Sequence, residues 1–159
     1  MFKYKSSPIV IVVLLVLSSI FFAIYYKISK IEIEKDNKLL TNDIVFSGII
    51  TDLKVSKNHA FGILQLKIIK TNNYSFKPYL EGELYPYAIK DSVAEIYNYI
   101  PLSIKKGYKV QINSNKKTIT FYDGDKIKYQ WEIYIVSEER DIDFVKKNTI
   151  FDDVGNVSD

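Results

Sequence analysis

The chain contains no cysteine and only one histidine, His59, in 159 residues. Without cysteine, disulfide scaffolds, thiolate zinc sites, cysteine nucleophiles and the lipid anchor of bacterial lipoproteins are all excluded. One histidine cannot build the usual zinc sites, which need several nitrogen or sulfur ligands. A Ser-His-Asp triad would have to use His59, which lies in a polar turn without a neighbouring nucleophile.

Sequence motifs for phosphate and metal binding are also missing. The chain has neither a Gly-x-x-x-x-Gly-Lys loop nor a dinucleotide fingerprint. The stretch Asp123-Gly124-Asp125 lacks the spaced ligands and the distal glutamate of a calcium loop. We therefore expect no catalytic, cofactor-binding or metal-binding residue, and we expect that the protein is not an enzyme.

Charge is concentrated at one end of the chain. Four of the 22 basic residues lie within residues 1–30, which contain no acidic residue. The remaining 129 residues carry 18 basic and 19 acidic side chains and are nearly neutral. A nearly neutral domain lacks the basic surface of nucleic-acid binders, so we expect no nucleic-acid partner.

Residues 8–26 form a hydrophobic run of 19 residues without a charge. A helix of this length is roughly 30 Å long, which matches the hydrocarbon core of a bilayer. Tyr25 and Tyr26 lie at its end, where aromatic rings favour the headgroup layer. The sequence therefore predicts a short basic tail at 1–7 and a transmembrane helix at 8–26.

A cleaved secretory signal is the competing interpretation of this run. Its apolar stretch is longer than the usual 7–15 residues, and Phe21 precedes Ala23 at a position that favours small residues. We therefore expect a retained signal-anchor with the bilayer as its partner. Lysines flank the run almost evenly, but the short basic start favours a cytoplasmic N-terminus and a β domain outside the membrane.

The next residues, 27–43, mix charged side chains with isoleucine and leucine, which predicts either a helical stalk or a flexible linker. Alternating apolar and polar residues then begin at 44 and predict strands. A polar cluster at 56–59 separates two such runs, 49–55 and 61–69, which indicates a hairpin. Gly48 favours a bulge or bend in the first strand.

Residues 108–136 predict a three-stranded meander. Turns are expected at 113–116 and at Asp123-Gly124, where both residues tolerate positive φ. The last strand places Ile127, Trp131 and three other apolar residues on one face, so we expect Trp131 in the core.

The middle and the end of the chain are less regular. Short extended pieces are expected at 74–80 and 85–89, while 91–100 fits either a strand or a short helix with a capping box at Ser92 and Glu95. Residues 137–159 predict a tail that is partly helical or disordered. Residues 44–136 thus predict a mainly β domain, an OB-like or SH3-like open barrel of five to six strands.

Two surface features suggest ligands without specifying one. Small lysine clusters at 105–109 and 116–117 fit either anionic headgroups or solvated loops. Ten tyrosines beyond residue 30 fit either a glycan- or peptide-binding surface or plain β-propensity.

The basic start, the run at 8–26, the strand FSGIITDLKV and the segment AIKDSVAEIYN together resemble a group of short single-pass membrane proteins of unknown function from Bacteroidetes-type bacteria. Lys90 stands where that group would have a glycine. The resemblance implies a small β domain on one membrane helix and no catalytic residue. We expect an envelope protein that binds a protein or a glycan. The alternative is an accessory subunit of a membrane complex that acts through its transmembrane helix.

Overall fold

The computed structural model describes residues 8–57 and 59–151. The chain divides into two units, Met1–Asn37 and Lys38–Asp159. The basic tail predicted at 1–7 and the C-terminal residues 152–159 lie outside the described residues.

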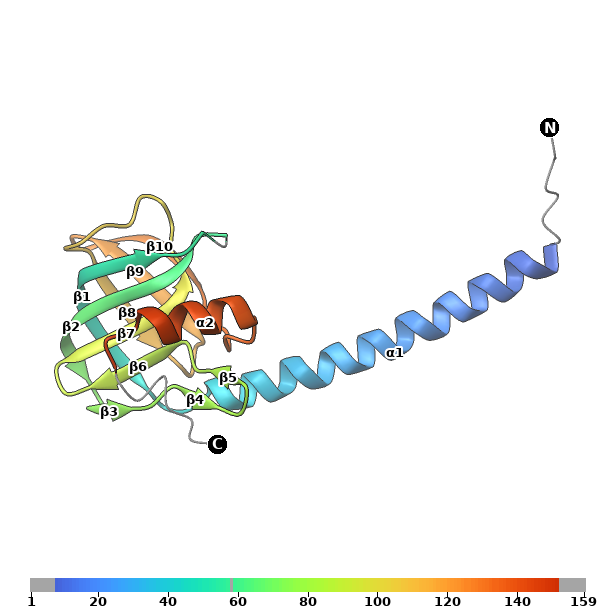
Figure 1. Cartoon of the computed structure of the whole chain (residues 1–159), viewed down its shortest axis with the longest axis horizontal. Coiled ribbons are helices and arrows are strands. Elements are labelled where there is room, and N and C mark those ends of the chain that lie inside the picture. The colour runs from blue at the N-terminus through green and yellow to red at the C-terminus, as the bar shows by residue number, and fades with distance from the viewer. Residues whose placement is uncertain (1–7, 58, 152–159) are drawn as a thin grey trace. The chain divides into compact units, whose positions relative to one another are not determined.

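A single helix, α1 (Pro8–Leu40), makes up the described part of the first unit and ends in the second (Figure 1). Its segment Ile9–Leu40 is long and apolar enough to cross a membrane. Residues 9–17 are all apolar and exposed, so the helix has no polar face there, as expected for a span rather than an interfacial helix. Residues 27–43, predicted as a helical stalk or a linker, continue α1 as far as Leu40.

The second unit is mainly β. Its large sheet has eight strands in the order β10-β9-β8-β1-β2-β7-β6-β3, and neighbouring strands are antiparallel. The strands are β1 (Val45–Val55), β2 (Phe61–Thr71), β3 (Ser75–Phe76), β6 (Tyr87–Lys90), β7 (Val93–Tyr99), β8 (Lys109–Asn113), β9 (Thr118–Asp123) and β10 (Lys126–Glu132). The sheet is open, and β10 and β3 are its two edges.

A small hairpin lies beside the large sheet. It consists of β4 (Tyr79–Leu80) and β5 (Glu83–Leu84), with Gly82 in its turn at a φ of 73°. Leu84 and Val136 exchange two backbone hydrogen bonds of 3.0 and 2.8 Å. The chain that follows β10 is thereby attached to β5.

The large sheet has a hydrophobic core on each face. The inner core receives side chains from almost every strand, among them Phe46, Leu64, Ile96 and Phe121, because the sheet curves around it (Figure 1). The outer core is smaller and lies where helix α2 (Glu139–Asn148) packs on β2. Alternation along β2 explains the division, since Phe61 and Ile63 enter the outer core and Leu64 and Leu66 enter the inner one.

The hairpin of β1 and β2, the meander of β8 to β10 and the bulge at Gly48 are confirmed. Residues 91–100, left between strand and helix, contain strand β7. The predicted count of five to six strands is too low, because the short strands between residues 75 and 90 pair separately around prolines. The segment 137–159, predicted to be partly helical or disordered, contains helix α2, which packs on β2 of the large sheet.

The hairpin between β9 and β10 differs from the prediction by one residue. Asp123 pairs with Lys126, so the central turn residues are Gly124 and Asp125, with Gly124 at a φ of 61°. A bulge between Ile127 and Tyr129 then shifts the register of β10. Ile127 is consequently 60% exposed, while Trp131 is half-buried against the inner core.

Replacing Trp131 by alanine should destabilise the β unit by about 2–3 kcal/mol, somewhat less than for a fully buried tryptophan. The ring contacts Phe121 and Tyr129, each at 5.5 Å between centroids. Ile127→Ala, on the same predicted face but exposed, should cost less than about 0.5 kcal/mol. Guanidinium unfolding followed by circular dichroism compares the two. Equal effects would contradict the register found for β10.

Candidate functional site

The residues that the sequence singled out do not come together. His59 is exposed in the turn between β1 and β2, with a φ of 46°. Among the described residues, no group of three or more histidine, cysteine, aspartate or glutamate side chains is placed to hold a metal ion.

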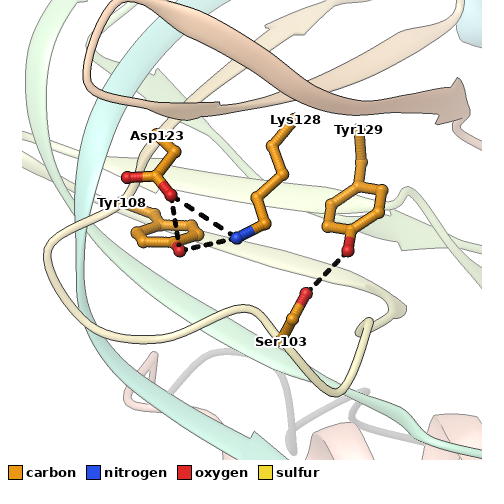
Figure 2. Close-up of polar contacts among 5 residues, drawn as sticks. All are labelled: Ser103, Tyr108, Asp123, Lys128 and Tyr129. Atoms are coloured by element: carbon orange, nitrogen blue, oxygen red, sulfur yellow. Dashed lines mark hydrogen bonds and ion pairs between the residues drawn. The ribbon is translucent and has the colours of Figure 1, made fainter.

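Tyr108, within the segment 105–109, joins a polar network with Asp123 and Lys128 of the β9–β10 hairpin (Figure 2). The Tyr108 hydroxyl donates to Asp123 Oδ2 at 2.9 Å, and Lys128 Nζ donates to the Tyr108 oxygen at 2.9 Å. Lys128 also lies 3.4 Å from the same carboxylate oxygen. The Lys105 ammonium lies over the Tyr108 ring, 5.8 Å from its centroid.

These contacts fix the charge states of the network. The hydrogen bond from Tyr108 and the Lys128 ammonium lower the pKa of Asp123, and the Tyr108 hydrogen bond and Asp123 raise the pKa of Lys128. A carboxylate with a lowered pKa is a poor general acid, and a lysine with a raised pKa is a poor nucleophile. The network is therefore suited to holding a loop on the meander rather than to catalysis.

Tyr108→Phe should raise the pKa of Asp123 toward its ordinary value. The variant removes the hydrogen bond from the Tyr108 hydroxyl, which is the largest cause of the lowered pKa. A carboxylate with a lowered pKa stabilises the fold above its unfolded-state pKa and loses that effect as the pH falls through its folded-state pKa. The variant should thus be less stable than the wild type at neutral pH. This difference in stability should shrink as the pH falls through the folded-state pKa of Asp123. Carbon-13 NMR titration of the carboxyl group measures the shift.

Tyr122→Phe is the matched control for this titration, since the Tyr122 hydroxyl donates to Gln111 at 3.0 Å instead of to Asp123. An unchanged Asp123 titration in Tyr108→Phe would contradict the assignment.

A second network surrounds Glu95 on β7, a carboxylate with no exposed surface. It accepts hydrogen bonds from the Tyr97 hydroxyl at 3.1 Å and from Gln65 Nε2 at 3.3 Å. It also accepts from the Thr149 hydroxyl and, at 3.1 Å, from the Ile150 backbone N–H. Four donors from three segments meet at this carboxylate, so its oxygens are occupied and the residue joins the C-terminal segment to the sheet.

Burial and the nearby Glu95 carboxylate raise the pKa of Tyr97 well above its usual value, so its phenol stays protonated and remains a donor. From the sequence, Glu95 was expected only as part of a possible capping box with Ser92. The signal in the sequence that could have revealed this network is the alternation along the strand, which places Glu95 and Tyr97 on the same face.

A third network ties the chain after α1 to the β unit. Asp43 and Asn115 bond reciprocally, with N–H to Oδ1 at 3.1 Å and Nδ2 to Oδ1 at 2.7 Å. The buried Tyr87 hydroxyl donates to Asn42 Oδ1 at 2.8 Å, and burial raises the pKa of Tyr87 to about 12. These groups position the backbone at residues 42–45 and offer no reactive atom.

A pocket of about 290 Å³ lies between the end of β7 and the start of α2, and it combines aromatic with acidic lining residues. The rings of Tyr99 and Tyr134 are stacked at 5.6 Å between centroids and form its aromatic part. Its polar part contains Glu138 and the buried Asp141. The complete lining is Tyr99, Tyr134, Ile135, Val136, Ser137, Glu138 and Asp141.

The sequence indicates the tyrosines only as a group and not this pocket, because its two rings are 35 positions apart in the chain. No known protein family, curated protein or solved structure matches the chain.

Proposed function

We propose that the chain is a membrane-anchored, non-catalytic binding or scaffolding protein of the cell envelope. The observation that carries the proposal is the joining of an apolar helix, long enough to cross a bilayer, to a β unit with its own two cores. As a fold type we propose a small open barrel, OB-like or SH3-like, enlarged by short strands, since one sheet curves around one core.

The chemistry of the polar networks supports a binding rather than an enzymatic role. The Asp123–Lys128 pair is held in its charged state, Glu95 is saturated with donors, and Asp43 is bonded to Asn115. Each of these groups stabilises the fold, whereas catalysis needs a group with a free reactive atom. The pocket beside Tyr99 and Tyr134 is the surface through which such a protein would bind.

The second candidate function is an accessory subunit that acts through α1. The feature of the sequence that suggests this role is the pair Ser18 and Ser19, whose hydroxyls could form hydrogen bonds with a neighbouring helix. Both hydroxyls donate to the Leu15 carbonyl of their own helix, at 2.9 and 2.8 Å. This arrangement satisfies both donors within α1, while each hydroxyl oxygen can still accept a hydrogen bond from a neighbouring helix.

An anchor replacement separates the two candidates. Residues 8–26 are exchanged for an unrelated single-pass span, and in-cell crosslinking with mass spectrometry compares the bound proteins. A binding role of the β unit predicts that the crosslinked partners persist. Their complete loss, at equal membrane abundance, would contradict it and support the accessory subunit.

Two reporters placed after Asp159 test the proposed orientation. An export-dependent phosphatase should be active, and a fluorescent protein that matures only in the cytosol should stay dark. The reverse result would place the β unit in the cytoplasm and overturn the envelope assignment.

A further inference from the structure

We propose that the pocket between β7 and α2 binds a basic side chain of a partner protein, with arginine preferred to lysine. The inference rests on the proposed binding function and names the chemistry of the partner at that site.

The size and lining of the pocket fit one long cationic side chain. A volume of about 290 Å³ is at the lower end for ligand pockets, which span about 300–1,000 Å³ and enclose whole small molecules. Arginine and lysine carry an apolar stem and a charged head, and here two tyrosines and two aliphatic residues line the pocket together with two acidic residues. The stem has an apolar wall and the head has an anionic end.

The local charge is negative. Residues 137–143 contain the acids Glu138, Glu139, Asp141 and Asp143 against a single base, Arg140. The N-terminus of α2 contributes about half a positive charge, which these residues outweigh. An anionic ligand is therefore disfavoured and a cationic one is attracted.

The tyrosine pair supplies the second observation. Tyr134 is half-buried, and its ring stacks on that of Tyr99, so the pair forms one aromatic wall of the pocket. Tyr99 is 40% exposed, so its ring is accessible to a guanidinium plane.

Arg140 indicates why a guanidinium is preferred. Its Nε and Nη2 both donate to Glu138 Oε1, at 3.0 and 2.7 Å. The pocket carboxylate thus already accepts a planar fork of donors, a geometry that an ammonium cannot reproduce. Arg140 is also an internal competitor, since it shares Glu138 with any incoming arginine.

The test uses the full chain in nanodiscs with carbon-13-labelled tyrosine, titrated with N-acetyl-arginine amide. Lysine and citrulline amides serve as comparison probes, citrulline being the neutral analogue of arginine. We expect saturable shifts at Tyr99 and Tyr134 with arginine, weaker shifts with lysine and none with citrulline. Equal shifts with citrulline, or no shift at either ring, would overturn the proposal.

Variants of neighbouring acids give the matched control. Glu138→Gln should weaken arginine binding about fivefold, as expected for one charge pair near the surface. Glu139→Gln makes the same charge change just outside the lining and should weaken it less than about twofold. Arg140→Gln should strengthen binding by removing the competitor.

If Glu138→Gln and Glu139→Gln weakened arginine binding equally, the effect would come from the overall negative charge of the region. That result would contradict a defined binding site. The outcome is separable from that of the anchor replacement. Partners that persist on an unrelated span, together with a pocket that ignores arginine, would leave the binding function standing and remove only this site.

Discussion

Replacing Gly62 by alanine should destabilise the β unit by about 3 kcal/mol or more, at the upper end for overpacking of a core. Gly62 lies in the centre of three strands, opposite Val55 on β1 and Asn98 on β7. An added Cβ would lie 2.3 Å from the Lys54 carbonyl oxygen and 2.7 Å from Ile100 Cδ1. The first contact is with backbone, so relief requires a shift of β1 rather than a rotamer change.

Gly82→Ala separates this steric effect from backbone strain. Gly82 has a φ of 73°, and nothing lies within 4 Å of an added Cβ. The cost there is that of a left-handed residue, about 1–2 kcal/mol. Fluorescence of Trp131, the only tryptophan, reports unfolding of the β unit in the full chain. A smaller loss in Gly62→Ala than in Gly82→Ala would show that β1 and β2 are not so close.

The two strand glycines differ in how far the sequence revealed them. Gly48 was predicted to sit at a bulge, and the pairing of β1 with β2 shifts there, between Ser47 and Gly48. Gly62 looked like an ordinary strand residue in the sequence, because the steric need for glycine there comes from the nearby Lys54 backbone and Ile100 side chain. A local pattern contains no information on such a close approach between segments.

The meander and the first hairpin were predictable because each strand alternates between a buried and an exposed face. Residues 74–90 were only partly predictable, since two-residue strands such as β3 and β4 are too short to show a period. The packing of the tail was not predictable for another reason. Its helix is strongly charged, yet Ile142 and Val145 enter the outer core and anchor it.

The candidate site was out of reach for a physical reason as well. Its rings come from β7 and from the segment after β10, and the Glu95 network joins residues 54 and 55 positions apart. Only the folded sheet brings these groups together. The sequence shows that tyrosine is frequent, but it does not indicate that Tyr99 and Tyr134 line a common pocket.

Glu95→Ala should cost about 3–5 kcal/mol, because it leaves one buried and three partly buried donors without an acceptor. The donors are the side chains of Gln65, Tyr97 and Thr149 and the backbone N–H of Ile150. A domain of this size has only about 5–15 kcal/mol of stability in total. The variant should therefore be marginally folded at 25 °C.

Two further variants should reduce the stability by smaller, graded amounts. Glu95→Gln keeps the volume and one carbonyl acceptor, but it turns an NH2 group toward donors, so we expect about half the loss. Thr149→Val removes a single donor and should cost about 1–2 kcal/mol. Glu139→Ala, an exposed acid at the start of α2, should change stability by less than about 0.5 kcal/mol.

Hydrogen exchange tests the role of Glu95 in holding the C-terminal segment. In Thr149→Val, which stays folded, the amides of Ile150 and of the last turn of α2 should exchange faster, while those of β1 and β8 keep their protection. The Ile150 amide is the most direct reporter, since it donates to Glu95 at 3.1 Å. Uniform acceleration in all strands would indicate general destabilisation instead. An unchanged denaturation midpoint in Glu95→Ala would mean that the carboxylate is not the acceptor that joins β7 to residues 149 and 150.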